Sequence, residues 1–284
     1  MKKQQFIVAG SGIIVLIIFY FFGHTVPPLK KSAPSNTTAT ETQLLDIKTI
    51  LDASKAKLSA NKLDYINRLE HSVVRGDVKN QQVKSFHQLA AFWRDSTENG
   101  VLPFAYYTSE ASKLENSEKS LTFAAQLFLN NLRGQDNPAI KIWMANQSRD
   151  LFERAELLNP DNDSTKIGLG ATYIFGNTAD QPADIMKGIQ KILEVTRRDS
   201  LNMYAQLMLG LGGIQSGQFD KAVQRLLKVV HYDAGNLEAV LNLGEAYERM
   251  GDKNSAKKWY LDAKKLTNNQ ELIDAIDERL ETLK

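Results

Sequence analysis

The sequence predicts an all-α protein, an α-solenoid of helical hairpins behind a single N-terminal transmembrane helix. Three observations support this fold class. A run of seventeen uncharged residues lies near the N-terminus, apolar residues recur at helical spacing from residue 43 onward, and the C-terminal part repeats with a period of 34 residues. The chain of 284 residues shows no convincing alternation of apolar and polar residues that would indicate a β-strand.

The first element is the apolar segment at residues 6–22. At about 1.5 Å per residue, a helix of this length nearly spans the ~30 Å hydrocarbon core of a bilayer. The residues that follow lack the small-residue cleavage site of a secretory signal peptide, so we predict an uncleaved signal anchor over residues 1–26. Lys2 and Lys3 precede the run, and the positive-inside bias favours a cytoplasmic N-terminus. We therefore expect a single-pass protein of the inner (cytoplasmic) membrane whose body lies in the periplasm.

The second element is a tether. Residues 27–42 contain three prolines and many small polar residues, which is typical of an extended, flexible linker. Residues 1–40 contain four lysines and no acid, while the whole chain has 35 Lys and Arg against 33 Asp and Glu, so the body is slightly acidic. This balance argues against nucleic-acid binding. The chain contains no cysteine, which excludes disulfides, cysteine-based metal clusters and a cysteine nucleophile.

The body begins with helices whose ends carry ordinary helix signals. Apolar stripes predict helices near 44–58, 61–75, 79–95, 103–115, 118–132 and 138–158. Pro138 suits the first turn of a helix, and Asn159 with Pro160 ends one. Residues 43–120 therefore form helical hairpins of a generic kind.

The C-terminal part repeats residue types at a distance of 34 residues. The pairs are Gly210 and Gly244, Gly217 and Gly251, Ala222 and Ala256, Leu226 and Tyr260, and Val229 and Ala263. This pattern resembles the tetratricopeptide repeat, a helical hairpin of that length. The resemblance implies a divergent unit at 121–162, a unit with an insertion at 163–202, two regular units at 203–236 and 237–270, and a capping helix at 271–284.

The same resemblance indicates a groove lined by the first helix of each unit. In the family's register, the inward residues of two units are apolar, and those of the last unit include Glu238, Asn242 and Glu245. An apolar groove with an acidic end suits an extended or helical peptide. The candidate binding residues are Ile167, Ala171, Ile174, Phe175, Tyr204, Leu207, Met208, Leu211 and Ile214. Alternatively, the protein's own N-terminal helices fill this groove.

The predicted function is that of a membrane-anchored scaffold or adaptor with a protein or peptide partner. The architecture resembles the ancillary subunit of the Sec translocon and the anchored repeat proteins of cytochrome c maturation, which implies a role in export, chaperoning or complex assembly. The translocon, a chaperone or another membrane complex is the implied partner. A cytosol-facing receptor or assembly factor on an organelle, with the opposite topology, is the alternative.

Nothing in the sequence indicates catalysis, so we expect no enzyme, no cofactor and no metal site. The four histidines have no metal-ligand spacing, and the glycines at 210–217 match neither phosphate-binding motif. A remote alternative is an enzyme whose N-terminal half is not recognised. Gly212 and Gly213 lie inside a predicted helix, where each costs about 1 kcal/mol relative to alanine. They predict a helix that is either locally soft or closely packed.

Overall fold

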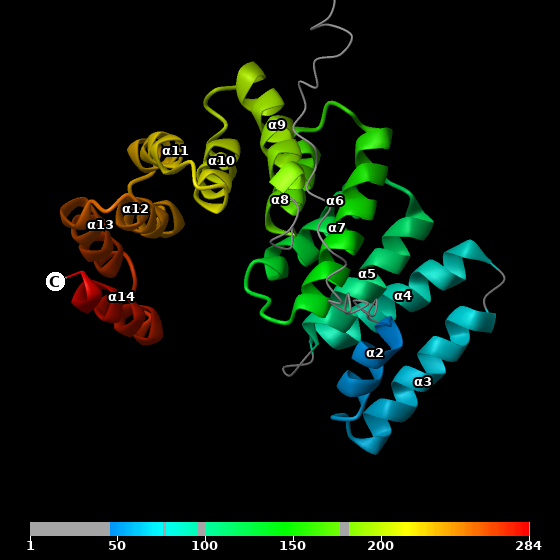
Figure 1. The fold of residues 1–284 in the computed structure, drawn as a ribbon. Helices are drawn as coiled ribbons and strands as arrows, with labels where there is room; N and C mark the ends of the chain where they lie inside the picture. Colours follow the sequence, from blue (N-terminus) through cyan, green and yellow to red (C-terminus); the bar gives the residue numbers. More distant parts are fainter. Residues whose placement is uncertain (1–45, 76–77, 96–99, 177–181, 284) are drawn as a thin grey trace, which may run out of the picture. The chain divides into compact units, whose positions relative to one another are not determined.

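The structure, a computed structural model, describes residues 46–75, 78–95, 100–176 and 182–283. Within these ranges thirteen helices follow one another and no strand occurs (Figure 1). The helices are α2 (Ile47–Lys55), α3 (Ala60–Arg75), α4 (Lys79–Arg94), α5 (Val101–Glu115), α6 (Glu118–Leu132), α7 (Pro138–Leu158), α8 (Asp163–Phe175), α9 (Pro182–Arg198), α10 (Met203–Gln215), α11 (Phe219–Tyr232), α12 (Leu237–Arg249), α13 (Lys253–Lys265) and α14 (Gln270–Thr282).

The predicted helices of the body are confirmed from α3 to α7, with ends that differ by two residues at most. The ends are set by local chemistry. Asn116 adopts a left-handed conformation (φ 53°) that stops α5, and the Asn137 side chain accepts hydrogen bonds from the first amides of α7, directly before Pro138. Each of these signals acts within a few residues, so it is visible in the sequence.

Helices α2–α5 share a core of their own, which includes Leu51, Ile66, Leu89 and Trp93. Glu70 on α3 lies at its edge and holds three helices together. Its carboxylate accepts the hydroxyl of Tyr107 on α5 at 2.5 Å and the Lys55 ammonium of α2 at 2.6 Å. Burial and this carboxylate both raise the pKa of Tyr107.

From α6 onward consecutive helices pack as hairpins, α6 with α7, α8 with α9, α10 with α11 and α12 with α13. In three hairpins a glycine of the first helix faces a large side chain of the second. A Cβ atom added at Gly170, Gly210 or Gly244 would lie 2.5–2.7 Å from Ile192, Leu226 or Tyr260. The same contact thus recurs along the chain, and it confirms the repeat in spatial terms.

The turns between hairpins also repeat. Asn162, Asn202 and Asn236 each precede the first helix of a unit, and each side chain accepts a hydrogen bond from the amide three residues later at 2.9–3.0 Å. The turn before α10 begins with Asp199, and the turn before α12 begins with Asp233. Their carboxylates accept the amide of the residue two positions on. The two ends of each turn are therefore fixed by side chains.

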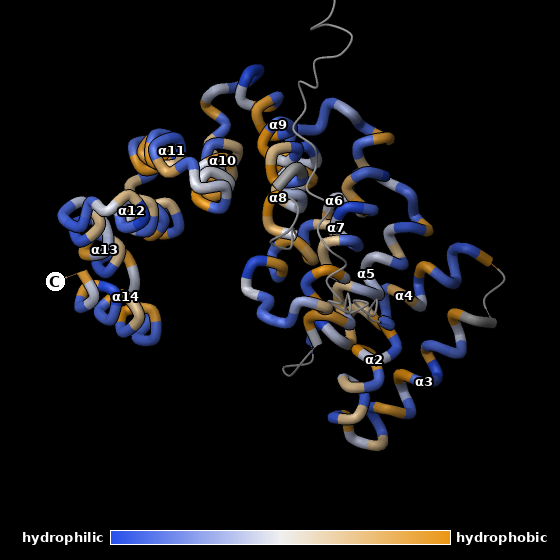
Figure 2. The backbone as a smooth tube through the Cα atoms, viewed as in Figure 1, coloured by the Kyte–Doolittle hydropathy of each residue, from blue (hydrophilic) through white to orange (hydrophobic). Residues whose placement is uncertain are grey.

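The last helix, α14, closes the array. Ile276 and Leu283 are buried against Val240, Ala256 and Tyr260 of the preceding hairpin, and acidic residues occupy much of the exposed side. Figure 2 shows hydrophilic and hydrophobic residues alternating along α11 to α14, as expected for amphipathic helices.

The glycines inside α10 are explained by close packing. A Cβ atom at Gly212 would lie 2.9 Å from Ile174 of α8, and one at Gly213 would lie 3.0–3.2 Å from Ala222 of α11. Of the two predicted alternatives, a closely packed helix is therefore confirmed.

The expectation of a single-pass inner-membrane protein has to be corrected. In the part of the chain that the structure describes, no helix combines the length and the apolar character needed to cross a bilayer. The longest of these helices, α7, has 21 residues but carries charges such as Arg149, Asp150 and Glu153. The predicted span at residues 6–22 and the tether at 27–42 lie outside the described residues.

Candidate functional site

The predicted inner groove is largely part of the protein core. Six of its residues are buried, three on α8 and three on α10, while Phe175 and Ile214 pack at the edge of the same core. Tyr204 is the most exposed of the set. The structure thus brings the predicted residues together on two neighbouring helices, but it leaves little of their surface accessible. The buried residues are Ile167, Ala171, Ile174, Leu207, Met208 and Leu211.

An arginine links α6, α8 and α12, each of which is the first helix of a hairpin. Arg133, at the end of α6, lies 5.0 Å above the ring of Phe175 on α8 and donates a hydrogen bond to Glu238 on α12. Burial is the main cause of a raised pKa at Tyr204, and the nearby Glu238 carboxylate raises it further. Partner binding at the predicted groove stays a prediction, and Tyr204, Phe175 and Ile214 are the residues of the set that are not fully buried.

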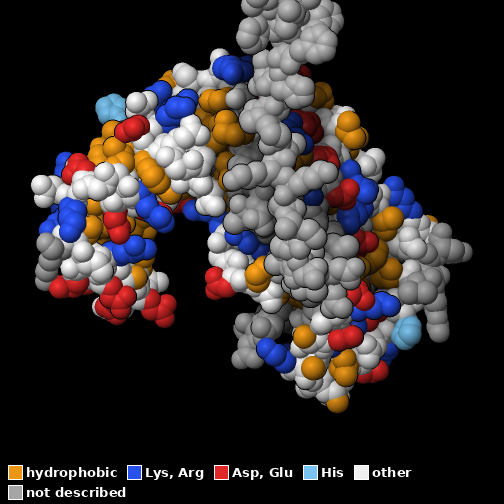
Figure 3. Space-filling view, in the orientation of Figure 1, with side chains coloured by type: hydrophobic (Ala, Val, Ile, Leu, Met, Phe, Trp, Pro, Cys, Tyr) orange, Lys and Arg blue, Asp and Glu red, His pale blue; other side chains and the backbone are white. Residues whose placement is uncertain are grey.

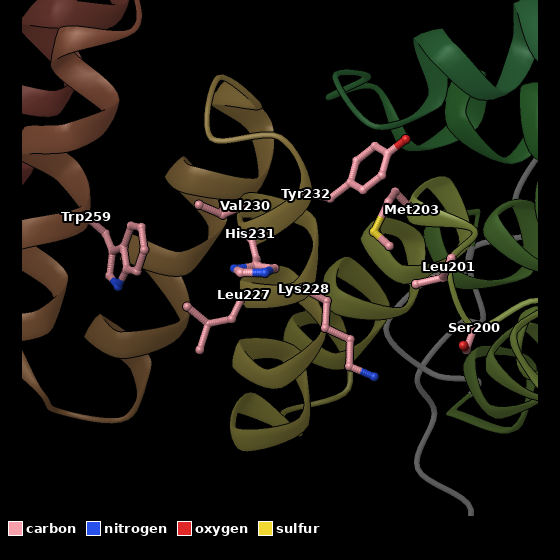
Figure 4. Close-up of a pocket in the computed structure, with 9 residues that line it drawn as sticks. All are labelled: Ser200, Leu201, Met203, Leu227, Lys228, Val230, His231, Tyr232 and Trp259. Carbon is pink, nitrogen blue, oxygen red and sulfur yellow. The ribbon is translucent and has the colours of Figure 1, made fainter.

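A more accessible apolar surface lies on the second helices of the repeats. It is a pocket of about 680 Å³ formed by α11, the start of α10 and α13, and we call it the α11 groove (Figure 4). Figure 4 shows Leu227 on α11 and Trp259 on α13, with Leu201 and Met203 on the other side of α11. The lining residues are Ser200, Leu201, Met203, Leu227, Lys228, Val230, His231, Tyr232 and Trp259.

Several lining side chains are large, apolar and exposed. Leu201 and Tyr232 expose 72% and 73% of their surface, and Leu227 exposes 37%. Figure 3 shows hydrophobic side chains gathered at the surface over α10 and α11. Single exposed apolar residues are common, but a cluster around a hollow is typical of an interaction site.

The fold does not require leucine at position 201. This residue is the third of the four-residue turn from Asp199 to Asn202. The corresponding position is Asp161 in the turn before α8 and Gly235 in the turn before α12, and the Asn cap forms in all three cases. Because the turn accepts an acid or a glycine there, the exposed leucine is free to serve binding.

The ionisable side chains that line the α11 groove, apart from Tyr232, are of basic types. Lys228 and His231 line it, and Lys258 lies 5.4 Å from the ring centre of Trp259. No Asp or Glu is among the lining residues. The nearest acids in sequence, Asp199 and Asp233, each accept a turn amide at 2.9 Å. The groove is therefore apolar with a positive edge.

The sequence carried a signal for this groove that periodicity alone did not isolate. Leu226 and Val229 belong to the buried stripe of α11, whereas Leu227 and Tyr232 lie off that stripe and still are apolar. An apolar residue on the polar side of an amphipathic helix is the feature that could have identified the site.

A second hollow, of about 530 Å³, lies along α4. Its apolar side chains are only Val83 and Ala91, and His87 is paired with Glu115 at 2.6 Å. It is therefore a less suitable site for an apolar segment. Among the described residues, no group of three or more His, Asp or Glu is placed to hold a metal ion.

Comparison with known proteins supports the assignment of the repeat. The family model for the tetratricopeptide repeat matches residues 214–276, from the end of α10 into α14. No curated protein matches this chain.

Solved structures resemble the fold at low sequence identity. TTC0263, a thermophilic tetratricopeptide-repeat protein of Thermus thermophilus, has a TM-score of 0.53 at 16% identity, over 72% of this chain and 98% of its own. MamA of Desulfovibrio magneticus RS-1 has a TM-score of 0.46 at 18% identity, over 69% of this chain and 98% of its own. YrrB, described as a tetratricopeptide-repeat protein with an unusual peptide-binding site, has a TM-score of 0.44 at 14% identity, over 82% of this chain and 97% of its own. At such identities the likeness to the Thermus protein concerns the fold, an all-α helical solenoid.

Proposed function

We propose that this chain, a helical solenoid in which residues 214–276 match the tetratricopeptide repeat, is a scaffold that binds a segment of a protein partner in the α11 groove. Tetratricopeptide-repeat proteins generally serve as non-enzymatic scaffolds for other proteins. The observation that supports this site is the cluster of exposed apolar side chains around the groove, with Leu201 at a turn position that the fold leaves open.

The groove has the properties of a binding site for an apolar segment. Covering an exposed leucine fully contributes about 1.5–3 kcal/mol, whereas micromolar binding requires about 8 kcal/mol, so Leu201 and Leu227 supply part of the binding energy and the aromatic side chains of the groove must supply more. Trp259 and Tyr232 are of the aromatic types that often dominate the binding energy of interfaces. This chemistry resembles the capture of an apolar segment in a groove between helices.

The proposal is tested with random 16-residue peptides displayed on phage and selected on the immobilised full-length chain. The variant Leu201→Asp introduces the residue that the turn before α8 already has, so its helices should form normally. We expect selected peptides to bind this variant at least about tenfold more weakly, which corresponds to the loss of about 1.4 kcal/mol. Fluorescence anisotropy of labelled peptides measures the affinity, and circular dichroism verifies the helix content.

Leu157→Asp is the matched control, because Leu157 exposes 84% of its surface on α7 and does not line the groove. Its affinity for the selected peptides should equal that of the wild type. If Leu201→Asp binds the peptides as tightly as the control does, the α11 groove is not the binding site.

A further inference from the structure

We infer that the segment bound in the α11 groove is acidic, with carboxylates placed beside its apolar side chains. This inference rests on the proposed function of the groove. It adds the chemical class of the partner, which the apolar lining alone does not define.

The lysines at the groove have no acidic partner among the described residues. Among the described residues, no ion pair includes Lys228 or Lys258, whereas Lys264 and Lys265 on α13 pair with Asp277 and Asp262 at 2.6 and 2.7 Å. Lys258 lies 5.4 Å from the ring centre of Trp259, so its ammonium group stays next to the groove. A neutral partner that covered these lysines would remove the water that solvates their charges and offer no compensating interaction. A carboxylate would form an ion pair in place of that water.

Comparison of the repeats shows that one of these charges is particular to the groove. The position of Lys228 is Glu194 in the preceding unit and Asp262 in the following one, each 34 residues away. An acid at this position is therefore compatible with the second helix of a unit. The lysine is not needed for the hairpin, and it lies where the pocket forms.

The test uses three labelled 16-residue peptides that share leucines at spacings of three and four and carry Glu, Gln or Lys at the remaining positions. We expect the full-length chain to bind the Glu peptide about tenfold more tightly than the Gln peptide, and the Lys peptide more weakly still. Lys228→Glu should reduce or reverse this order, and higher salt should weaken binding of the Glu peptide. Fluorescence anisotropy measures each affinity.

Lys119→Glu is the matched control, since Lys119 is exposed on α6 and does not line the groove. It should leave the order of the three peptides unchanged. Equal binding of the Glu and Gln peptides, or no binding of the Glu peptide, would overturn the acidic partner while the phage experiment still tests the groove. Binding of the Glu peptide that Leu201→Asp leaves unchanged would instead overturn the groove itself.

Discussion

At the scale of single residues, a close approach between the backbones of two helices occurs at Gly188. A Cβ atom at this position would lie 2.3 Å from the carbonyl oxygen of Gly170 and 2.9 Å from Ile174. A backbone atom cannot move aside as a flexible side chain can, so the hairpin of α8 and α9 would have to open. We predict that Gly188→Ala lowers the free energy of unfolding by about 1–3 kcal/mol, measured by urea denaturation.

Gly134→Ala serves as the comparison, because a Cβ atom there would have no neighbour within 4 Å. It should change the stability little. Equal destabilisation by the two substitutions would contradict the close approach at Gly188.

The stability of α13 depends on pH through its N-cap residue, Asp252. Hydrogen bonds from the Ser255 hydroxyl, and then from backbone amides, lower the pKa of this carboxylate below its ordinary value of 3.8. Because the pKa of Asp252 is lower in the folded protein than in the unfolded chain, this carboxylate stabilises the fold at pH values above its ordinary pKa. The stabilisation is lost as the pH falls through the pKa of the folded state. We predict that wild type loses more stability than Asp252→Asn between about pH 5 and pH 2, measured as the urea midpoint at each pH. Parallel pH profiles of the two proteins would show that the cap does not titrate.

The residues of the predicted inner groove show the limit of reading a site from periodicity. The repeat register predicts that Leu207 and Leu211 lie on the inner face, but α10 contains no charged residue and is buried over most of its length. Glycines let α8 and α11 approach it from two sides. When a helix is apolar all round, spacing cannot separate a residue that lines a groove from one that fills the core. Substituting either leucine with Asp would therefore test stability rather than binding.

At the scale of elements, the Asn caps determine where the first helix of a unit begins. The Asn236 side chain accepts the amide of Ala239 at 2.9 Å at the start of α12. We predict that Asn236→Ala lowers the free energy of unfolding by about 1 kcal/mol, and that it increases hydrogen exchange in the first turn of α12. Asn268→Ala is the comparison, because Asn268 is exposed beside the capping residue of α14 and should be nearly neutral. A neutral result at Asn236 would show that water caps this helix equally well.

Helix positions were predictable because such signals are local. The ends of α5 and α7 depend on Asn116 and on Asn137 with Pro138, which lie at the boundary itself. The groove was not predictable in the same way. It combines Leu201 from a turn, Leu227 from α11 and Trp259 from α13, and their proximity is a result of the packing of two hairpins and the turn that precedes them.

At the scale of the whole described array, the bond between Arg133 and Glu238 is unusual for repeats. The two residues are 105 positions apart in sequence, whereas repeat units generally contact only their neighbours. The link therefore couples α12 to α6, which belongs to the hairpin three units earlier. We predict that Arg133→Ala speeds hydrogen exchange in α12, and that a double-mutant cycle with Glu238→Ala gives a coupling of about 0.2–1 kcal/mol, because both side chains are partly exposed.

Arg154→Ala is the matched comparison. Arg154 pairs with Asp150 within α7 at 3.1 Å, so its loss removes a similar ion pair without connecting distant helices. Exchange in α12 should then remain at the wild-type rate. Identical effects of Arg133→Ala and Arg154→Ala would show that the long-range bond carries no coupling.

In the turn before α10, the residues that fix the backbone differ from the residues that line the groove. The side chains of Asp199 and Asn202, the first and last residues of this turn, accept hydrogen bonds from backbone amides. The side chains of the two residues between them do not hold the turn in this way. Ser200 and Leu201 both line the groove. A change of partner could consequently arise through substitutions at these two positions, without any adjustment of the helices on either side. In an engineered version, this turn would be the natural place to introduce a new binding preference.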